Sequence, residues 1–400
     1  MKEHTLTKGS VGRGILLFVL PIIVGSLIQQ LYVTIDAVVV GQFTGKLGLA
    51  AIDSVHTLFK FPLNFMNGLA SGATILISGH CGSGDEKQMH CSIRTACTVA
   101  VILGVVCSIG GVILTPWMLH IMSVPEEVYG RALIYTCIYF GGIWSMVLYN
   151  MAAGILRAYG DSKRPLYFLA ASCMVNIALD IVLVVFFRLG VVGAAIATIL
   201  SQLFSAFLVV VCLIRTRDMH RLVLRELRLD GRMLKRIIRI GLPAGMQSVM
   251  YGLSNVIIQS GINSLGTNTV AAWAAYSKLD SMFWMMINAF GISITTFVGQ
   301  NYGAGKPKRI WQGIKASVLM MTIYSAFMFG VLMLGARTFA LLFVDPVEWE
   351  ILKDTELFLH ISVSFFPVLG LLCILRYSIQ GAGFTNLAML SGVSEMIARI

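Results

Sequence analysis

Charged residues are scarce in this sequence. Asp, Glu, Lys and Arg make up only 12% of its 400 residues, whereas hydrophobic residues make up 57% and the mean hydropathy is +0.83. So few charges exclude an ordinary soluble enzyme and are typical of a polytopic helical membrane protein. The first apolar run is as long as a bilayer span and lacks a small-residue cleavage site, so we expect a membrane helix there and no cleaved signal peptide.

The sequence also lacks the motifs of metal, redox and nucleotide chemistry. Its eight cysteines form no CxxC pair, and its seven histidines show no HxxxH spacing. HExxH, GxSxG and paired-Asp protease motifs are missing, which argues against an intramembrane enzyme. Gly82-x-Gly84 and Gly303-x-Gly305 have no strand-to-helix context and no Lys-Ser/Thr, so they predict tight turns. We expect no cofactor, no resident metal and no nucleotide partner.

What the sequence does contain is a series of long apolar runs. They predict eleven membrane helices, near 15–41, 47–79, 93–119, 131–157, 165–188, 191–214, 236–265, 269–299, 312–343 and 355–382, with the last starting near Thr385 and cut off at Ile400.

The net charge of +11 is unevenly distributed over the loops between these helices. Of the 30 Lys and Arg residues, 21 fall in the loops on the side of the N-terminus, nine of them between Arg215 and Arg239. The opposite loops hold about five basic residues together with the acidic pair Glu126-Glu127. This positive-inside pattern predicts a cytoplasmic N-terminus, and it explains the basic loop without nucleic acid.

The two halves of the chain resemble each other. Leu20-Pro21 matches Leu242-Pro243, Gly45-x4-Ala50-Ala51 matches Gly266-x4-Ala271-Ala272, Asn67 matches Asn288, and Gly82-Ser-Gly84 matches Gly303-Ala-Gly305, at offsets of 222 and then 221 residues. Six helices per copy is an even number, so both copies cross the membrane in the same sense, as parallel repeats. Such a pair of lobes predicts a transporter, since no pore-lining ring or re-entrant filter of a channel is evident.

From this repeat we predict an N-terminal lobe at 1–214, a basic cytoplasmic linker at 215–235 and a C-terminal lobe at 236–400. The second copy stops within its fifth helix, so we expect twelve helices in a complete protein and regard the chain as a fragment.

Polar side chains occupy three of the predicted helices of the first lobe at one depth. Asp36 lies about five residues from the outer end of its helix, Thr198 about seven and Asp180 about eight, which is about 8 to 12 Å below the outer surface. Asn176 lies four residues before Asp180, on the same face. Ionisable groups inside a membrane are functional candidates by default.

Two carboxylates in a poorly solvated pocket need a shared proton or a cation between them, and hard cations take oxygen ligands such as those of Asp, Asn and Thr. The four residues therefore predict a cation-coupling site for Na⁺ or H⁺, and the sequence does not separate the two. A buried hydrogen-bond cluster that only ties three helices together is the structural alternative.

Several other polar residues within the apolar runs are candidates for lining or gating a substrate cavity: Gln30, Asp53, Lys60, Tyr251, Lys278 and Asp280. Pro21 and Gly25 are candidate hinge positions in the first helix. Arg376, near the inner end of its helix, is interpreted as a side chain that extends to the membrane surface.

At this point the chain resembles the multidrug and toxic compound extrusion (MATE) family, in particular its DinF- and MepA-like bacterial branch. The resemblance rests on Gln29-Gln30-Leu-Tyr-x3-Asp36-x4-Gly41-Gln, on the two glycine turns, and on Leu156-Arg-Ala-Tyr-Gly160-Asp-Ser-Lys-Arg-Pro165 with its repeat partner Gln380-Gly-Ala-Gly383-Phe-Thr385.

The resemblance implies secondary active export of amphipathic organic cations in exchange for Na⁺ or H⁺, across a bacterial or archaeal cytoplasmic membrane, by a protein we expect to be a monomer. Asp36, Asn176, Asp180 and Thr198 match the cation site in the family's N-terminal lobe. Tyr251 stands where the NorM-like branch carries a Glu, which argues against a second cation site in the C-terminal lobe. The alternative function is a lipid-linked oligosaccharide flippase of the same superfamily, for which basic residues in the central cavity are expected.

Overall fold

The computed structural model describes residues 6–216 and 218–399, and these residues are helical nearly throughout. The elements are α1 Val11–Ser83, α2 Glu86–Ile121, α3 Glu126–Tyr159, α4 Lys163–Asp180, the π-helix η1 Ile181–Phe186, α5 Gly190–Arg215, the 3₁₀ turn η2 Leu224–Glu226, α6 Gly231–Ser264, α7 Thr267–Gly303, α8 Pro307–Ala340, α9 Trp349–Gly381 and α10 Thr385–Arg399. The backbone of α1 leaves helical geometry at Gly45, whose φ is 71°, so α1 comprises two of the predicted helices. The all-α fold with eleven helices is thus confirmed.

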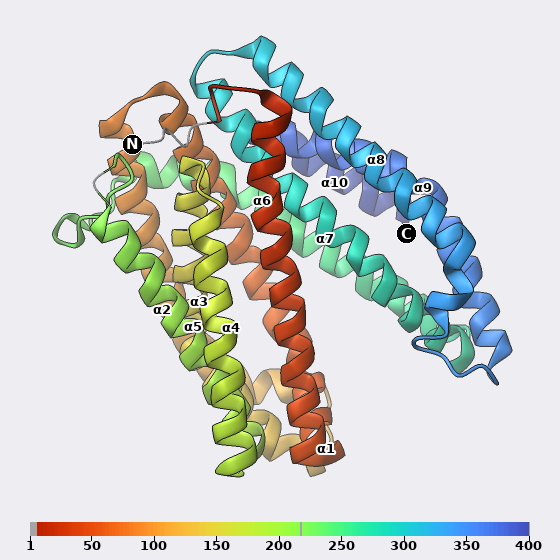
Figure 1. Ribbon diagram of the computed structural model, residues 1–400. Helices are drawn as coiled ribbons and strands as arrows, with labels where there is room; N and C mark the ends of the chain where they lie inside the picture. Colours follow the sequence, from red (N-terminus) through yellow and green to blue (C-terminus); the bar gives the residue numbers. More distant parts are fainter. Residues whose placement is uncertain (1–5, 217, 400) are drawn as a thin grey trace.

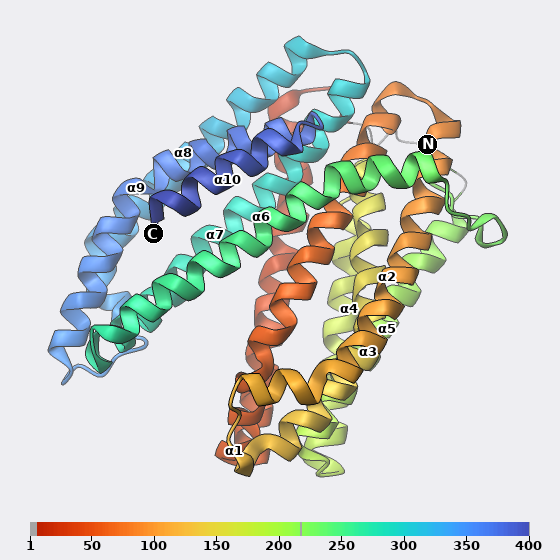
Figure 2. The same cartoon turned by 180° about the vertical axis from the view of Figure 1, so that it is seen from behind.

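The helices form two bundles, one of α1 to α5 and one of α6 to α10 (Figure 1). The bundles meet at the end that holds the N-terminus and spread apart toward the other end, as the reverse view also shows (Figure 2). We call the first the basic end, because the N-terminus and the Arg-rich connection between α5 and α6 lie there. Eight of the described helices are long and apolar enough to cross a membrane. The multi-pass architecture follows from their length and composition.

At the basic end, the first turns of α1 pack in the core of the second bundle and the first turns of α6 pack in the core of the first. Ile15 and Phe18 of α1 are buried among side chains of α7, α8 and α9. Met233 and Ile237 of α6 are buried in the core of the first bundle, against α2 and α3. Ile15 and Ile237 are 222 residues apart and both are fully buried, so they are equivalent positions of the sequence repeat. The crossing of these two helices ties the lobes together there.

Glycines allow the two lobes to approach closely at this end. A Cβ on Gly72 of α1 would lie 2.4 Å from the Cα of Gly241 in α6, and one on Gly68 would lie 2.3 Å from the Cα of Gly245. Distances this short leave no room for a methyl group, so the backbones of α1 and α6 touch only because these residues are glycines. This glycine seam explains how the two lobes can seal one end while their other ends remain apart.

The segment before α1 adds polar contacts to the seal. Gln300 of α7 accepts a hydrogen bond from the Leu6 N–H at 2.8 Å and donates one to the Ala158 carbonyl of α3 at 2.7 Å. Arg309 of α8 donates to the carbonyls of Leu6 and Gly9. Buried Gln300 therefore bridges both lobes and the N-terminal segment, and leaves neither of its amide groups unpaired.

The glycine turns predicted from the sequence are confirmed. Gly84 ends α1 with φ 72°, a left-handed conformation that favours glycine, and Gly305 has φ 66° after α7. Gly82 and Gly303 serve a different purpose, since a Cβ on either would collide with a backbone carbonyl of the other lobe. These turns are part of the contact between lobes and not a phosphate-binding loop.

Candidate functional site

Three helices of the first lobe bring together the polar residues identified in the sequence. Asp36 comes from α1, Asn176 and Asp180 from α4, and Thr198 from α5. Asn176 and Asp180 are fully buried and Thr198 is nearly so. The carboxyl groups of Asp36 and Asp180 lie within hydrogen-bonding range of each other. The predicted convergence of the acids of the first and fifth helices is present in the structure.

The acids of this pair have few partners of their own. Among the described residues, no hydrogen-bond donor reaches Oδ1 of Asp36 or either carboxylate oxygen of Asp180. The side-chain amide of Asn176 is equally unpaired. Buried polar atoms without partners cost about 1 to 3 kcal/mol each, and more when they are charged. The two carboxyl groups face each other with no other donor among the described residues, so a shared proton or a bound cation is needed to relieve their repulsion.

Tyr32 links the site to Thr198. It lies one helical turn before Asp36 on α1, and its hydroxyl donates to Thr198 Oγ1 at 3.4 Å. Thr198 in turn lies one turn before the hydroxyl of Ser201, which donates to the Thr198 carbonyl at 2.8 Å. The hydrogen bond from Tyr32 shows that the Thr198 hydroxyl lies on the side of α5 that faces α1, where it adds a hydroxyl oxygen to the carboxylate and amide oxygens.

Aromatic side chains of α3 form one wall beside the acids. Tyr135 and Tyr139 lie one helical turn apart, both within electrostatic range of Asp36, and their rings stack with centroids 6.1 Å apart. Phe59 stacks on Tyr139 with centroids 4.0 Å apart. This wall was not predicted from the sequence. The spacing of Tyr135 and Tyr139 was the signal available, but aromatic residues at helical spacing are common in apolar helices.

The helix that carries Asp180 changes geometry directly after it. Regular α-helix ends at Asp180 and continues as the π-helix η1 through Phe186. A π-helix adds a residue to each turn, and π-bulges are frequent at functional sites. Here the wider turns follow the buried carboxylate of Asp180 immediately.

The donor set fits a small hard cation or a proton. Asp36, Asp180, Asn176 and Thr198 provide carboxylate, amide and hydroxyl oxygens from three helices, and no Lys or Arg of the described residues lies among them. Hard cations such as Na⁺ are held by oxygen ligands of this kind. A proton shared by the two carboxyl groups would relieve the same repulsion. The chemistry of these side chains therefore fits either ion.

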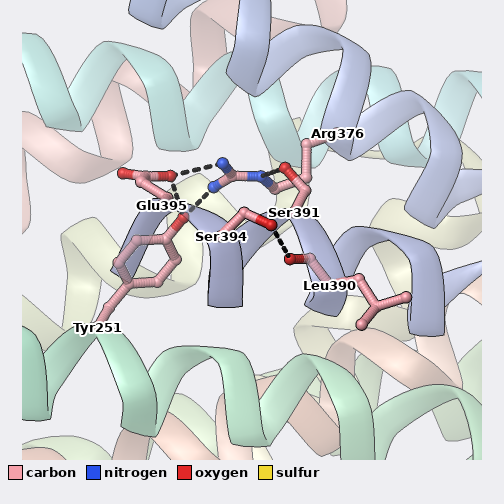
Figure 3. A network of polar contacts seen from close by, with 6 residues as sticks. All are labelled: Tyr251, Arg376, Leu390, Ser391, Ser394 and Glu395. Carbon is pink, nitrogen blue, oxygen red and sulfur yellow. Dashed lines mark hydrogen bonds and ion pairs between the residues drawn. The ribbon is translucent and has the colours of Figure 1, made fainter. Parts of the chain in front are cut away.

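A second polar network, which was not predicted from the sequence, lies in the other lobe (Figure 3). Arg376 of α9 and Glu395 of α10 form an ion pair at 2.5 Å, with the two side chains 6% and 14% exposed. Tyr251 of α6 donates to Glu395 at 2.5 Å and accepts a hydrogen bond from Arg376. Ser391 accepts from Nε of Arg376 at 3.3 Å. The interpretation that Arg376 extends to the membrane surface is wrong, because its charge is neutralised inside the lobe.

Of the cavity and gate candidates, Tyr251 belongs to this second network. Gln30 and Lys278 are exposed, and Asp280 is half-buried on α7. The side chains of Asp53 and Lys60 lie outside the described residues. α1 runs through Pro21 and Gly25 as a helix, and within its described backbone the departure from helical geometry is at Gly45. The hinge at Pro21 or Gly25 stays a prediction.

Comparisons with known proteins agree with this architecture. The MatE family model matches residues 21–182 and 243–400, once in each lobe. The chain is 30% identical to the probable multidrug resistance protein YoeA of Bacillus subtilis, over 94% of this chain and 82% of that protein. It is 26% identical to the FAD transporter of Shewanella oneidensis, over 87% of this chain and 79% of that protein.

Among solved structures, the fold resembles that reported as the outward-facing conformation of a multidrug resistance MATE family transporter of the MOP superfamily. The TM-score is 0.92 at 22% identity, and the match covers 99% of this chain and 88% of the other.

Proposed function

This chain belongs to the MatE family of membrane transporters, and we propose that it exports amphipathic organic cations across a bacterial cytoplasmic membrane in exchange for Na⁺ or H⁺. It is not an enzyme. The observation that carries the exchange mechanism is the pair of facing carboxyl groups of half-buried Asp36 and buried Asp180, of which Oδ1 of Asp36 and both oxygens of Asp180 lack donors among the described residues. A pair that is complete only with a cation or proton is suited to bind one on one side of the membrane and release it on the other.

The orientation follows from the charges of the loops. The basic end, where the lobes are sealed, would face the cytoplasm by the positive-inside rule. The bundles spread apart toward the opposite end, so this conformation would admit ions and release cargo on the outside. Alternating access requires the glycine seam of α1 and α6 to open while the outer ends close.

Ion binding would act on the cargo through α1. Asp36 lies on the same helix whose first turns, at Ile15 and Phe18, pack in the opposite lobe. When a cation or proton joins Asp36 to Asp180, α1 is drawn toward α4, and hinging near Pro21 or Gly25 would let its outer part move while its inner part stays fixed. The movement narrows the space within the first lobe and displaces bound cargo outward.

The cargo class follows from the sign of the unpaired charges. In the described part of the first lobe, the charged side chains at the ion site are the carboxylates Asp36 and Asp180, whereas Arg94 and Arg157, whose Nε atoms are also buried without a partner, lie at the basic end in α2 and α3. The carboxylates attract organic cations, and the tyrosine wall of α3 provides aromatic faces for them. The lipid-linked oligosaccharide flippase alternative requires unpaired basic groups for a pyrophosphate. The buried Arg376 does not provide one, because Glu395 neutralises it.

A second candidate function is export of an anionic dinucleotide. The observation that favours it is the similarity to the FAD transporter of Shewanella oneidensis over 87% of this chain. The carboxylate pair argues against it, since a cargo with two phosphates would be repelled from the first lobe.

Transport by the purified chain in proteoliposomes distinguishes these functions. We expect a gradient of Na⁺ or of protons directed out of the liposomes to drive uptake of a fluorescent organic cation such as ethidium, because the ion leaves the liposome as the cation enters. Driven movement of FAD without movement of ethidium would overturn the cation proposal, and movement that neither gradient accelerates would overturn the exchange mechanism.

A further inference from the structure

The connection between the lobes exposes an unusual mixture of arginine and leucine. We define the basic rim as residues 221–239, which include η2 and the first turns of α6. Seven basic side chains of the rim are exposed, namely Arg221, Arg225, Arg228, Arg232, Lys235, Arg236 and Arg239, against two acidic residues, Glu226 and Asp230. None of the seven makes an ion pair within 4.0 Å with another described residue.

Exposed apolar side chains alternate with these charges along the same segment. Four apolar side chains are between 38% and 52% exposed, namely Leu224, Leu227, Leu229 and Ile238. Other apolar side chains of the same segment are buried in the core. An apolar side chain at a water-facing surface loses the stabilisation of burial, about 25 cal/mol for each Å² left in water. Exposed leucines between arginines are typical of segments that lie in the interface of a membrane.

The rim is held in place rather than free to move. Leu222 is buried and its N–H donates to the Leu213 carbonyl of α5 at 3.0 Å. Met233 and Ile237 are buried in the core of the first lobe. Asp230 accepts from the Met233 N–H at 2.9 Å, and this hydrogen bond holds the pKa of its carboxyl below the ordinary value. One of the two acids of the rim is therefore already occupied as the cap of α6.

The position of the rim brings it to the surface of the bilayer. It follows α5, which ends at Arg215, and it leads into α6, so both of its ends are attached to helices of the membrane domain. Charges fixed within about 10 Å of the lipid head groups act on them with little screening at physiological salt. Topology alone requires basic residues in such a loop, but it requires neither exposed leucines nor an anchored backbone.

We propose that the basic rim is a binding surface for anionic phospholipids of the leaflet it faces, with the arginines on the phosphate groups and the leucines among the upper acyl chains. The charge of the rim is complementary to phosphate head groups, and guanidinium groups bind phosphate through paired hydrogen bonds. The leucines favour a lipid over a soluble anion, since a soluble anion would leave them in water. Occupied by lipid, the rim fixes the start of α6 and with it one side of the glycine seam.

Lipid titration of the purified full chain tests this proposal. We expect phosphatidylglycerol added to mixed micelles to raise the thermal unfolding midpoint more than phosphatidylcholine does, and this gain to disappear when the salt concentration is raised to about 0.5 M. In the variant R225Q/R228Q/R232Q the apparent affinity for phosphatidylglycerol should fall at least about tenfold, given a contribution of about fivefold per basic residue at a charged surface.

The matched control removes the same charge elsewhere at the basic end. Lys87, Lys163 and Lys308 are exposed at the starts of α2, α4 and α8, so K87Q/K163Q/K308Q should change the affinity less than about threefold. The variant L224S/L227S keeps every charge and should weaken the binding of lipid but not the smaller effect of inorganic phosphate.

Equal loss in the two triple variants would overturn the proposal, because the effect would then belong to net charge alone. So would equal stabilisation by phosphatidylcholine and phosphatidylglycerol, or inorganic phosphate or a short RNA reproducing the full gain.

Discussion

The two lobes share a sequence repeat and a fold but bury opposite kinds of polar site. The first lobe holds two carboxyl groups, Asp36 and Asp180, with no cationic partner among the described residues. The second holds Arg376 and Glu395, which neutralise each other and are completed by Tyr251 (Figure 3). The first site has no counter-charge among the described residues, whereas the second provides its own. Under the proposed function, ion exchange would therefore take place in the first lobe.

The largest effect is expected in the first lobe. Asp36→Asn keeps the shape of the side chain but removes the charge that an ion would compensate, so ion-driven transport of an organic cation into inside-out vesicles should fall close to background. Glu127→Gln makes the same chemical change at an exposed position at the start of α3 and should leave transport unchanged. Full ion-driven transport by Asp36→Asn at normal expression would remove the distinction between the lobes.

In the second lobe the expected effect is on stability. Glu395→Gln leaves the buried guanidinium of Arg376 without its counter-ion, so the free energy of unfolding should fall by about 3 to 5 kcal/mol. The double variant R376M/E395L replaces the pair with apolar side chains and should recover most of that loss. Thermal unfolding of the purified variants measures both. If folded R376M/E395L were stable but no longer coupled to an ion gradient, the second lobe would share the exchange function.

A smaller effect is expected where the lobes touch. Gly72→Ala adds a methyl group 2.4 Å from the Cα of Gly241, so the seam has to separate at a cost of about 1 to 3 kcal/mol. The conformation sealed at the basic end should become less populated, which labelling of a cysteine introduced near the seam would report. Gly141→Ala in α3 meets no atom within 4 Å and is the control. Equal labelling of the two variants would show that the glycines are not needed for the seal.

The smallest effect is expected at the edge of the ion site. Thr198→Val keeps the shape but removes the hydroxyl that accepts from Tyr32, at a cost of about 1 kcal/mol. The concentration of coupling ion needed for half-maximal transport should then rise by about fivefold with the maximal rate kept. Thr115→Val in α2 removes a hydroxyl that bonds only its own helix and should leave that concentration unchanged. A lost maximal rate in Thr198→Val would place the hydroxyl in the transport step and not in ion binding.

The first lobe was largely predictable from the sequence. Apolar runs predicted the helices, and the equal depth of Asp36, Asp180 and Thr198 in three of these helices predicted that they form one site. The boundaries were less certain, since the first helix extends to the break at Gly45 and not to Gly41. An apolar run shows where a chain can be helical but not where the helix ends. Here the helix ends where Gly45 adopts a positive φ, which the apolar run does not show.

The second lobe was less predictable, for a physical reason. Arg376 and Glu395 are 19 residues apart on different helices, and their pairing depends on how α9 and α10 pack. A single Arg near a helix end is ordinarily a residue that reaches the membrane surface. The tyrosine wall of α3 was missed similarly, because nothing in the spacing of Tyr135 and Tyr139 shows that they face an acid on α1.

One measurement tests most directly whether ion exchange takes place in the first lobe and not in the second. D36N/D180N and R376M/E395L are reconstituted side by side in proteoliposomes, and export of an organic cation is driven first by a Na⁺ gradient and then by a pH gradient. The account predicts that D36N/D180N responds to neither gradient, and that R376M/E395L responds to whichever gradient drives the unmodified chain. A coupled D36N/D180N, or an uncoupled but folded R376M/E395L, would contradict it.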